Sequence, residues 1–436
     1  MKRSLSLSEK WYLRRLAKNS EEVRSIVPLL FKTAKIPFGD LVSILKEIIL
    51  TNEILLTSYT KNSKGVYAEI LSDPVVFPIY SEDNNLLSEE QIIVSAKKEC
   101  MMGINIFDQF PYKFVVYIGT SNIYVLMNFH HIMFDWDSIY ILLNQTIKLV
   151  SRYYSSSVSV KPSVGKYSEY VLKSLENFEI NQSKIHEYWK EKLSDCIEPL
   201  FTSRYRIKGE EFEDRRIFSF ENNNLNNICA KFRCTPLTTL IAVLGLTLSK
   251  KFKKKDFLLN TPYSERYQFT DMPTLGVMLY SSAVRFQNSW YSNSLRDYFI
   301  ELGTALREGF AHQPICLDEL RAYLPVLNNI EHSSLQVFYN HQFYVPLSVA
   351  QIDKEILKNF ELMDFFGAEE KEPRKALQPL TIESYQKDDS ITVKVLYSLE
   401  HFTQEEINSL VGLYQTVLLE IQSLPQDFLV NDFLDI

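Results

Sequence analysis

A hairpin that ends in two histidines is the feature that most constrains the fold of this chain. Residues 113–119 and 122–129 are short apolar runs rich in β-forming side chains, and they predict two strands joined by a turn. The second strand leads directly into His130 and His131. Because neighbouring side chains of extended backbone point to opposite faces, one histidine can face a cleft while the other packs inward.

A helix is predicted directly after the histidines. An apolar pattern with helical spacing covers about residues 138–153, and Asp137 and Ser138 in front of it are good helix N-caps. Asp135 lies in the turn between the strand and this helix. The segment therefore has the order strand, turn and helix, and such a turn is a common place for functional side chains.

Strands and helices of ordinary length follow through the rest of the chain, which favours an α/β layered architecture. Helices are predicted at 8–18, 39–57 (running into a turn and strand), 166–194, 236–252, 294–310 and 404–423, and strands at 215–220, 257–261, 335–341 and 391–398. A chain of 436 residues is too long for one compact core, so two lobes are expected. The serine-rich stretch 156–164 predicts a linker between domains at 1–165 and 166–436, and the charged stretch 351–376 predicts an exposed crossing loop.

Composition excludes several classes of function. The net charge of −7 argues against a nucleic-acid partner, and no glycine-rich phosphate loop is found. The five cysteines are scattered without a C-x-x-C pair, and adjacent histidines diverge, so neither a disulfide framework nor a metal site is expected. The N-terminus lacks an apolar signal core, and no apolar run reaches the roughly 18–20 residues that span a membrane. A cytoplasmic protein is predicted, without a membrane partner.

Six groups of residues follow one another along the chain in the order of a known set of motifs. They are His130-His131-Ile-Met-Phe-Asp135, Tyr167-Ser-Glu-Tyr with Tyr188-Trp189, Pro262-Tyr-Ser-Glu-Arg266, Leu275-Gly276 with Arg285, His312-Gln313 with Leu317-Asp318-Glu319-Leu320, and Ser334 through Asn340. These groups resemble the motifs of the condensation domains of nonribosomal peptide synthetases, within the chloramphenicol-acetyltransferase-like superfamily. Several ordered motifs are much more specific than one histidine pair.

The resemblance implies two chloramphenicol-acetyltransferase-like α/β sandwich lobes in a V-shaped pseudo-dimer, with a tunnel for two carrier-borne substrates. It implies an amide-forming acyltransferase that joins a carrier-protein-bound acyl or peptidyl thioester to an amine acceptor in nonribosomal peptide biosynthesis. The phosphopantetheine arm would come with the partner carrier protein, so no bound cofactor is expected. No adenylation or carrier domain is found in the sequence, so these partners are expected in trans or on a longer parent polypeptide.

The resemblance also implies roles for single residues. His131 would face the tunnel as the catalytic general base, or as the group that orients the nucleophile and stabilises the tetrahedral intermediate. His130 would pack inward. Asp135 would hold the catalytic turn through an arginine, for which Arg266 is the first candidate and Arg285 the second.

The chain departs from the motif pattern at four positions. Trp136 stands where the family usually has glycine, Asp137 where it often has tryptophan, Leu56 where it has arginine, and Tyr280 where it has asparagine. A tryptophan beside the catalytic turn could narrow the tunnel, while Asn340 could contribute a polar contact near the reacting carbonyl. Two alternatives stay open: an ester-forming acyltransferase of the same superfamily that uses an alcohol acceptor or acyl-coenzyme A, and a catalytically inactive carrier-docking module.

Overall fold

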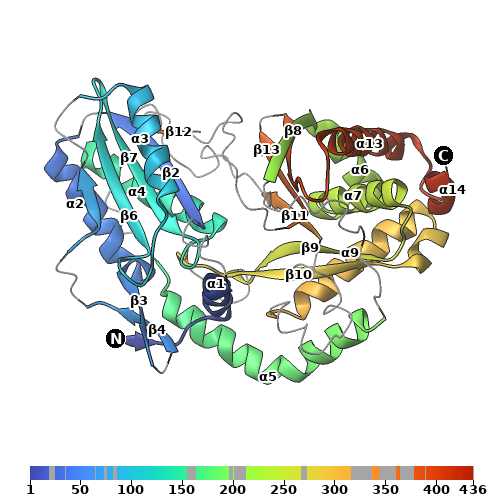
Figure 1. The fold of residues 1–436 in the computed structure, drawn as a ribbon, viewed down its shortest axis with the longest axis horizontal. Coiled ribbons are helices and arrows are strands. Elements are labelled where there is room, and N and C mark those ends of the chain that lie inside the picture. Colours follow the sequence, from blue (N-terminus) through green and yellow to red (C-terminus); the bar gives the residue numbers. More distant parts are fainter. Residues whose placement is uncertain are drawn as a thin grey trace. The chain divides into compact units, whose positions relative to one another are not determined.

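The structure is a computed structural model of the 436-residue chain (Figure 1). It describes residues 1–18, 25–34, 36–63, 65–72, 76–81, 86–154, 164–195, 200, 213–266, 273–315, 336–342, 360–363, 378–387 and 389–435. Most of the predicted linker at 156–164 and of the predicted crossing loop at 351–376 therefore lies outside the described residues.

The chain divides into two compact units. Unit 1 is drawn from Met1–Ile180, Ser264–Leu279 and Val345–Gly367, and unit 2 from Asn181–Tyr263, Tyr280–Tyr344 and Ala368–Ile436. This division differs from the predicted domains at 1–165 and 166–436, because parts of the second predicted domain are built into unit 1. Tyr167 and Tyr170, for example, are buried in the hydrophobic core of unit 1.

The main sheet of unit 1 has five strands in the order β12-β2-β7-β6-β5. They are β12 (Phe360–Met363), β2 (Ile26–Ala34), β7 (Asn122–His130), β6 (Tyr112–Ile118) and β5 (Ile79–Ser81). The predicted hairpin is confirmed, since β6 and β7 pair antiparallel along their whole length. Within the predicted crossing loop, β12 is an edge strand that pairs antiparallel with β2.

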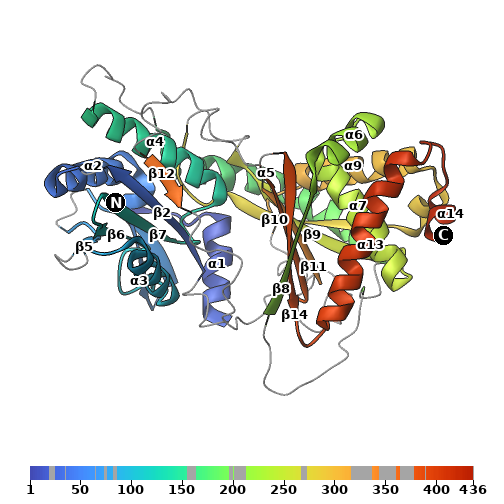
Figure 2. The ribbon, with the colours of Figure 1, turned by 90° about the horizontal axis from the view of Figure 1, so that it is seen from above.

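Helices cover both faces of this sheet. Figure 2 shows α2 (Phe38–Thr51) and α4 (Trp136–Tyr154) on one face and α3 (Glu89–Met101) on the other. Side chains of β7 alternate between the two cores, with Val125 and Met127 toward α2 and α4 and Leu126 toward α3. Double coverage explains why β7 is an almost continuous apolar run instead of an alternating one.

The rest of unit 1 consists of a small sheet and helical segments beside it. The small sheet has the strand order β1-β4-β3. Its strands and neighbouring helices are β1 (Lys2–Arg3), α1 (Leu7–Lys18), the 3-10 turn η2 (Glu53–Leu56), β3 (Thr57–Asn62) and β4 (Gly65–Ile70). The predicted helix at 8–18 is α1, and the pattern predicted over 39–57 is α2 followed by η2 and β3. The long helix α5 (Tyr167–Leu193) begins in unit 1 and ends in unit 2.

Unit 2 contains a six-stranded sheet with the order β10-β9-β11-β13-β14-β8. Its strands are β8 (Glu213–Glu221), β9 (Phe257–Ser264), β10 (Leu279–Phe286), β11 (Val337–Gln342), β13 (Leu380–Lys387) and β14 (Ser390–Ser398). Its helices are α6 (Asn222–Phe232), α7 (Pro236–Phe252), η3 (Asn288–Ser292), α9 (Leu295–Ala311), α13 (Gln404–Ser423) and α14 (Val430–Asp435). The core packs these helices against the alternating apolar positions Ile391, Val393, Val395 and Tyr397 of β14. The helices predicted at 236–252, 294–310 and 404–423 are confirmed as α7, α9 and α13.

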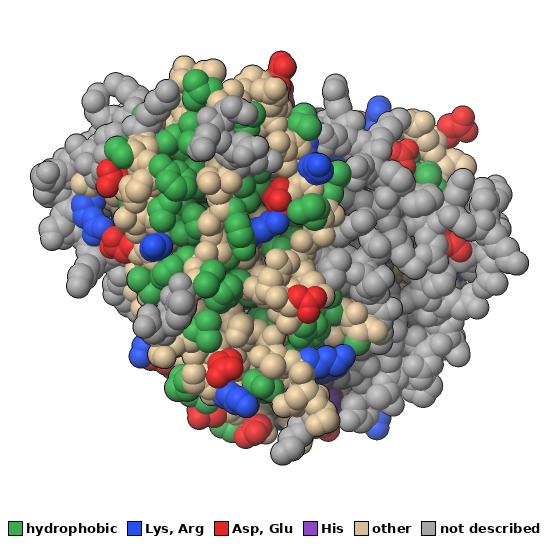
Figure 3. Space-filling view, turned by 60° about the vertical axis from the view of Figure 1, so that its left-hand side comes forward, with side chains coloured by type: hydrophobic (Ala, Val, Ile, Leu, Met, Phe, Trp, Pro, Cys, Tyr) green, Lys and Arg blue, Asp and Glu red, His purple; other side chains and the backbone are tan. Residues whose placement is uncertain are grey.

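The face of the molecule drawn in Figure 3 carries both signs of charge. Figure 3 shows hydrophobic side chains in patches, with Lys and Arg interspersed among Asp and Glu. A nucleic-acid surface would instead concentrate Lys and Arg on one face. Within the described ranges no single helix is long and apolar enough to cross a membrane; only the pair α6 and α7, bent by 95°, meets the length and composition test.

Candidate active site

His130 is the last residue of β7, and it packs inward as predicted. It pairs with Ile26 of β2 across the sheet and is fully buried. Its Nδ1 accepts a hydrogen bond of 3.0 Å from the main-chain N–H of Ile132. The ring of His130 therefore fixes the first residues of the turn that follows the strand.

His131 follows where the strand has ended, and its side chain is half-buried. The main-chain N–H of His131 donates to the carbonyl of Ser25 at 2.7 Å, which anchors the turn to the start of β2. The imidazole stacks on the ring of Tyr12 from α1, with centroids 5.2 Å apart and an interplanar angle of 25°. The guanidinium of Arg15, one turn further along α1, lies 5.7 Å from the Tyr12 ring centroid.

The surroundings of His131 favour its neutral form. Burial lowers the pKa of the His131 imidazole below its ordinary value, and the charge of Arg15 lowers it further, while nearby backbone groups and Asp135 oppose the change. The buried Nδ1 of His131 makes no hydrogen bond to a described residue. A neutral imidazole near physiological pH can accept a proton from a reacting group.

Asp135 is buried directly in front of α4 and is saturated with hydrogen bonds. Its Oδ1 accepts from the N–H and Oγ of Ser138 at 2.8 and 2.7 Å, and its Oδ2 accepts from the N–H of Met278 at 3.0 Å. The residue that caps α4 is therefore Asp135, and the prediction that Asp137 or Ser138 is the cap was wrong. Asp137 and Ser138 lie inside the first turn, because the helix begins at Trp136.

The predicted ion pair between Asp135 and Arg266 is confirmed. Nη2 of Arg266 lies 2.8 Å from Oδ1 and 2.9 Å from Oδ2 of Asp135, and both side chains are buried. The same nitrogen donates to the carbonyl of Gly276 at 3.1 Å, and Nη1 donates to the carbonyl of Thr274. Arg266 thus ties the turn before α4 to residues 274–276, and Asp135 has a structural place in this network.

Position 276 requires glycine for two reasons, its backbone conformation and the close contact with Tyr167. Its φ is +149°, and a Cβ at this position would come within 2.1 Å of the Tyr167 ring. Its N–H donates to Oγ of Ser138 at 3.1 Å, and its carbonyl accepts from the same hydroxyl at 3.0 Å. The Tyr167 hydroxyl donates to the carbonyl of Val277 at 2.8 Å. Glycine therefore lets residues 274–277 and α5 approach closely behind the His131 turn.

The residue before Arg266, Glu265, carries a second buried carboxylate. Oε2 of Glu265 accepts from the hydroxyl of Tyr170 at 2.9 Å and from Oγ of Ser174 at 2.7 Å. Neither Glu265 nor Tyr12 was singled out by sequence. Both act through partners that are far apart in the chain, so no local pattern could have revealed them.

Trp136 is the first residue of α4 and remains 40% exposed. Its indole N–H donates to the hydroxyl of Tyr140 at 3.2 Å, and the two rings form an edge contact with centroids 6.4 Å apart. The tryptophan therefore packs on its own helix. Leu56, at the position of the family's arginine, is the last residue of η2 and packs against the core of unit 1.

Arg285 and Asn340 belong to unit 2. Arg285 pairs with Asp256, with Nε–Oδ1 at 2.9 Å and Nη2–Oδ2 at 2.6 Å, and it also pairs with Asp195. The second candidate partner of Asp135 thus has acidic partners of its own. Asn340 is half-buried on β11 beside Glu383 of β13, while Tyr280 is buried on β10.

Two other motif segments meet each other in unit 2. The rings of Tyr188 and His312 stack with centroids 3.9 Å apart, and the indole N–H of Trp189 donates to the carbonyl of His312 at 2.9 Å. These residues join the end of α5 to the end of α9. The stacking and the hydrogen bond give Tyr188, Trp189 and His312 a role in packing the two helices together.

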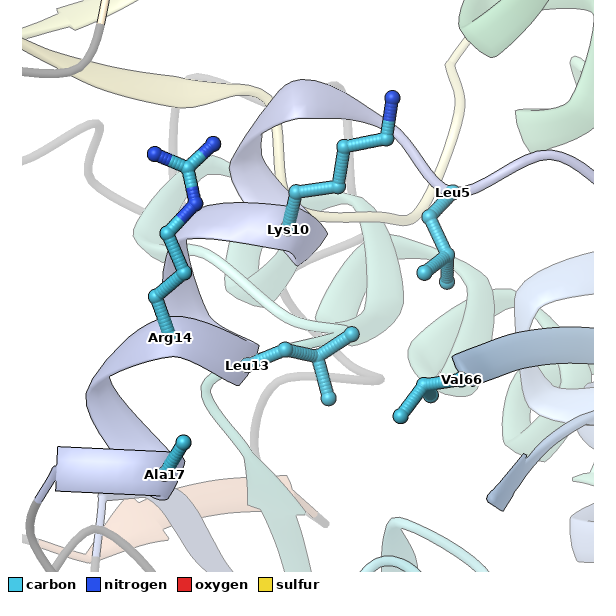
Figure 4. A pocket seen from close by; sticks show the side chains of 6 residues that line it. All are labelled: Leu5, Lys10, Leu13, Arg14, Ala17 and Val66. Atoms are coloured by element: carbon cyan, nitrogen blue, oxygen red, sulfur yellow. The ribbon is translucent and has the colours of Figure 1, made fainter. Parts of the chain in front are cut away.

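A shallow groove of about 340 Å³ lies elsewhere on unit 1. Its lining is Leu5, Lys10, Leu13, Arg14, Ala17 and Val66. Figure 4 shows the apolar side chains of α1 and β4 in this groove, with Lys10 and Arg14 extending away from them. Tyr12 projects from a different side of α1, so this groove is separate from the His131 turn. Among the described residues no group of three His, Cys, Asp or Glu side chains could hold a metal ion.

Comparisons with known proteins identify the class to which this fold and this histidine turn belong. A family model described as "Condensation domain" matches residues 11–433. The chain therefore belongs to the condensation-domain family, as its motifs indicated.

Individual relatives are distant in sequence. The hydroxamate-type ferrichrome siderophore peptide synthetase of Schizosaccharomyces pombe is 24% identical over 267 residues, which are 58% of this chain and 5% of that protein. This chain thus spans a small fraction of the curated relative that it matches.

Solved structures share the fold. The condensation domain of the Monacolin K polyketide synthase MokA aligns with a TM-score of 0.77 at 12% identity, covering 98% of both chains. A mutant starter condensation domain of rhizomide synthetase RzmA in complex with C8-CoA aligns with a TM-score of 0.75 at 11% identity, covering 99% of this chain and 97% of that chain. The epimerization domain from the third module of tyrocidine synthetase B aligns at 0.74 and 14% identity, covering 97% and 98%. The predicted chloramphenicol-acetyltransferase-like α/β fold is confirmed.

Proposed function

We propose that this chain joins a carrier-protein-bound acyl or peptidyl thioester to an amine acceptor, forming an amide in nonribosomal peptide biosynthesis. The observation that carries the proposal is the state of His131. Its ring is held by Tyr12 and lies next to a turn fixed by the buried Asp135–Arg266 pair, while its pKa is lowered by burial. Membership of the condensation-domain family supports the same reaction class.

The chemistry needs one proton acceptor. The neutral imidazole of His131 takes a proton from the amine as its nitrogen attacks the thioester carbonyl. The tetrahedral intermediate then collapses, the carbon–sulfur bond breaks, and the proton passes from His131 to the departing thiolate of the carrier's phosphopantetheine arm. No G-x-S-x-G elbow occurs in the sequence, so attack without an acyl-enzyme is the simpler path.

Asp135 and Arg266 act in this proposal as positioning residues. Both oxygens of Asp135 already accept hydrogen bonds from Ser138, Met278 and Arg266, which leaves the carboxylate little capacity for proton transfer. Their hydrogen bonds fix the position of the turn after β7 relative to the first turn of α4. His131 is thereby presented in a fixed orientation, which reduces the entropy cost of reaching the transition state.

The partners follow from the same chemistry. An acyl or peptidyl carrier protein would bring the thioester, and its phosphopantetheine arm arrives as part of the substrate. The roles of Asn340 as a polar contact, Arg285 as structural support and Trp136 as a substrate-shaping residue belong to the proposal. A cytoplasmic location is also part of it, since the three described cysteines are free thiols.

The test is a product assay with the purified chain. It offers an acyl-loaded carrier protein or the matching acyl-coenzyme A as donor, each with amine and alcohol acceptors, and detects products by mass spectrometry. Amide formation that depends on the carrier supports the proposal. Ester formation with an alcohol acceptor, or reaction with coenzyme A esters alone, would replace it by the ester-forming acyltransferase alternative. Inversion of a carrier-bound stereocentre would indicate an epimerase.

A variant separates catalysis from docking. His131→Ala should lose amide formation while keeping its circular dichroism spectrum and its affinity for the loaded carrier. If wild-type and variant proteins bind the carrier equally and neither forms product, the chain is a docking module. Lys148→Ala, a change at an exposed position of α4 away from the turn, is a control for protein handling and folding.

A further inference from the structure

Two of the five cysteines lie together where α6 ends and α7 begins in unit 2. Cys229 belongs to the last turn of α6, and Cys234 follows directly after Arg233. Both carry free thiols and both are partly exposed, whereas Cys100 is a buried core residue at 2% exposure. The acyl-transfer proposal uses neither of them.

The helix end itself brings the two side chains together. Arg233 adopts the left-handed conformation, with φ 53° and ψ 46°, and its N–H bonds to the carbonyl of Cys229. The N–H of Cys234 donates to the same carbonyl at 3.1 Å. The bond from Cys234 is the longer bond of a Schellman motif, and the bond from Arg233 is that of a simple left-handed helix cap; in a Schellman motif the two residues that the longer bond joins commonly make a side-chain contact. In this chain both positions of that contact are cysteines.

A single hydroxyl fixes both sulfur atoms. Oγ1 of Thr239, in the first turns of α7, lies 3.2 Å from Sγ of Cys229 and 3.0 Å from Sγ of Cys234. Thr239 is fully buried, whereas both cysteines are partly exposed. The hydroxyl therefore contacts the thiols from the protein interior, and the cysteines remain accessible from solvent. The two thiols also form a hydrogen bond with each other, so their sulfur atoms are direct neighbours.

The pKa values of the two thiols shift in opposite directions. The hydrogen bond from Cys234 lowers the pKa of Cys229 to about 7, with Thr239 adding to the effect. The same contact raises the pKa of Cys234, which stays a thiol. Because the thiolate is the reactive species, Cys229 would attack first and Cys234 would resolve the product.

We infer that Cys229 and Cys234 form a redox-modification site that reacts reversibly with low-molecular-weight disulfides. The Cys229 thiolate attacks one sulfur of the disulfide, breaking its S–S bond and releasing one thiol after protonation. Cys234 then attacks the sulfur of Cys229 in the mixed disulfide, giving up its proton to the second leaving thiolate. In total two protein thiols are oxidised to one disulfide, and one small disulfide is reduced to two thiols.

The sequence supplies a direct readout, because trypsin cleaves after Lys231 and after Arg233. The two cysteines therefore fall in separate peptides, Ile217–Lys231 and Cys234–Lys250. The folded full-length chain is incubated with glutathione disulfide, alkylated, digested and analysed by mass spectrometry. The expected product is these two peptides joined by a disulfide, and dithiothreitol should remove the link. Recovery of both cysteines in alkylated form, or links only to Cys196 or Cys316, would overturn the inference.

Variants test the order of attack. Cys234→Ser should lose the cross-link and accumulate glutathione on residue 229, because the resolving thiol is gone. Cys229→Ser should lose the cross-link and leave Cys234 largely alkylated rather than glutathionylated. Cys100→Ser is the matched control and should give the same cross-link yield as the wild-type chain. Equal glutathionylation of the two single variants would contradict the assigned roles.

Discussion

Arg266 and Arg285 both pair with carboxylates, but their ion pairs differ in the burial of the acidic partner. In unit 1, Arg266 and Asp135 are 8% and 0% exposed, and the pair connects the turn before α4 to residues 274–278. In unit 2, Arg285 is 9% exposed, while its partners Asp256 and Asp195 are 29% and 76% exposed. Arg285 keeps Asp256 when the exposed Asp195 is removed, whereas Arg266 would lose its buried carboxylate and become a buried charge left alone, which is costly. The comparison identifies the Asp135–Arg266 pair as the one on which the His131 turn depends.

The largest expected effect comes from breaking the buried pair. Asp135→Ala leaves the Arg266 guanidinium without its carboxylate and removes the cap of α4, which should cost about 3–5 kcal/mol of unfolding free energy. Urea unfolding followed by circular dichroism measures the change. Asp135→Asn keeps an oxygen that can cap α4 but also removes the charge opposite Arg266, so it should regain only the part of the loss that belongs to the cap. A loss below about 1 kcal/mol for the alanine variant would contradict the comparison.

Gly276→Ala should have the next largest effect. Its Cβ would meet the Tyr167 ring at 2.1 Å on a backbone with φ +149°, so overpacking should cost about 1–3 kcal/mol. Gly412→Ala is the matched control, because a Cβ there meets nothing within 4 Å and the residue lies in helix α13. That control should gain up to about 1 kcal/mol from helix propensity. Thermal unfolding of both variants makes the measurement, and equal shifts would contradict the argument.

Removing the ring beneath His131 should reduce the rate by a smaller amount. Tyr12→Leu loses the stacked contact, worth about 0.5–1.5 kcal/mol, so kcat should fall about 2- to 10-fold with KM little changed. Tyr12→Phe keeps the ring and should keep the rate. A larger fall in the phenylalanine variant would show that the hydroxyl, rather than the stacking, matters.

The smallest effect is expected at the exposed pair of unit 2. Asp195→Ala removes a partner that is 76% exposed, and the expected change is about 0–1 kcal/mol. Raising the salt concentration should reduce this difference further, because exposed charges are screened. A loss as large as that of Asp135→Ala would remove the distinction between the two pairs.

The parts of the site that sequence predicted are those fixed by local patterns. The apolar runs of β6 and β7 and the helical spacing of α4 act over a few residues each, so the place of His130 and His131 followed from them. The Arg266 partnership was predictable only through the resemblance to condensation domains.

Other parts depend on distant segments and could not be predicted. The stacking of Tyr12 on His131 joins α1 to the end of β7, and no sequence pattern near either residue predicts this contact. The strand β2 was missed, since Pro28 argues against a strand inside a sheet. Among the described residues, β12 pairs with residues 30–33 of β2, and Pro28 faces Asn128 of β7 on the other side of the strand.

The most direct test of the central claim is the pH dependence of single-turnover acyl transfer. The rate for wild type should rise with pH to a plateau, with a midpoint below about 6.5, because His131 must be neutral to accept a proton and its pKa is lowered by burial. His131→Gln should lose about 10²–10⁴-fold in rate and also lose this titration. A variant that keeps both the wild-type rate and the same pH profile would contradict the assignment of His131 as the catalytic base.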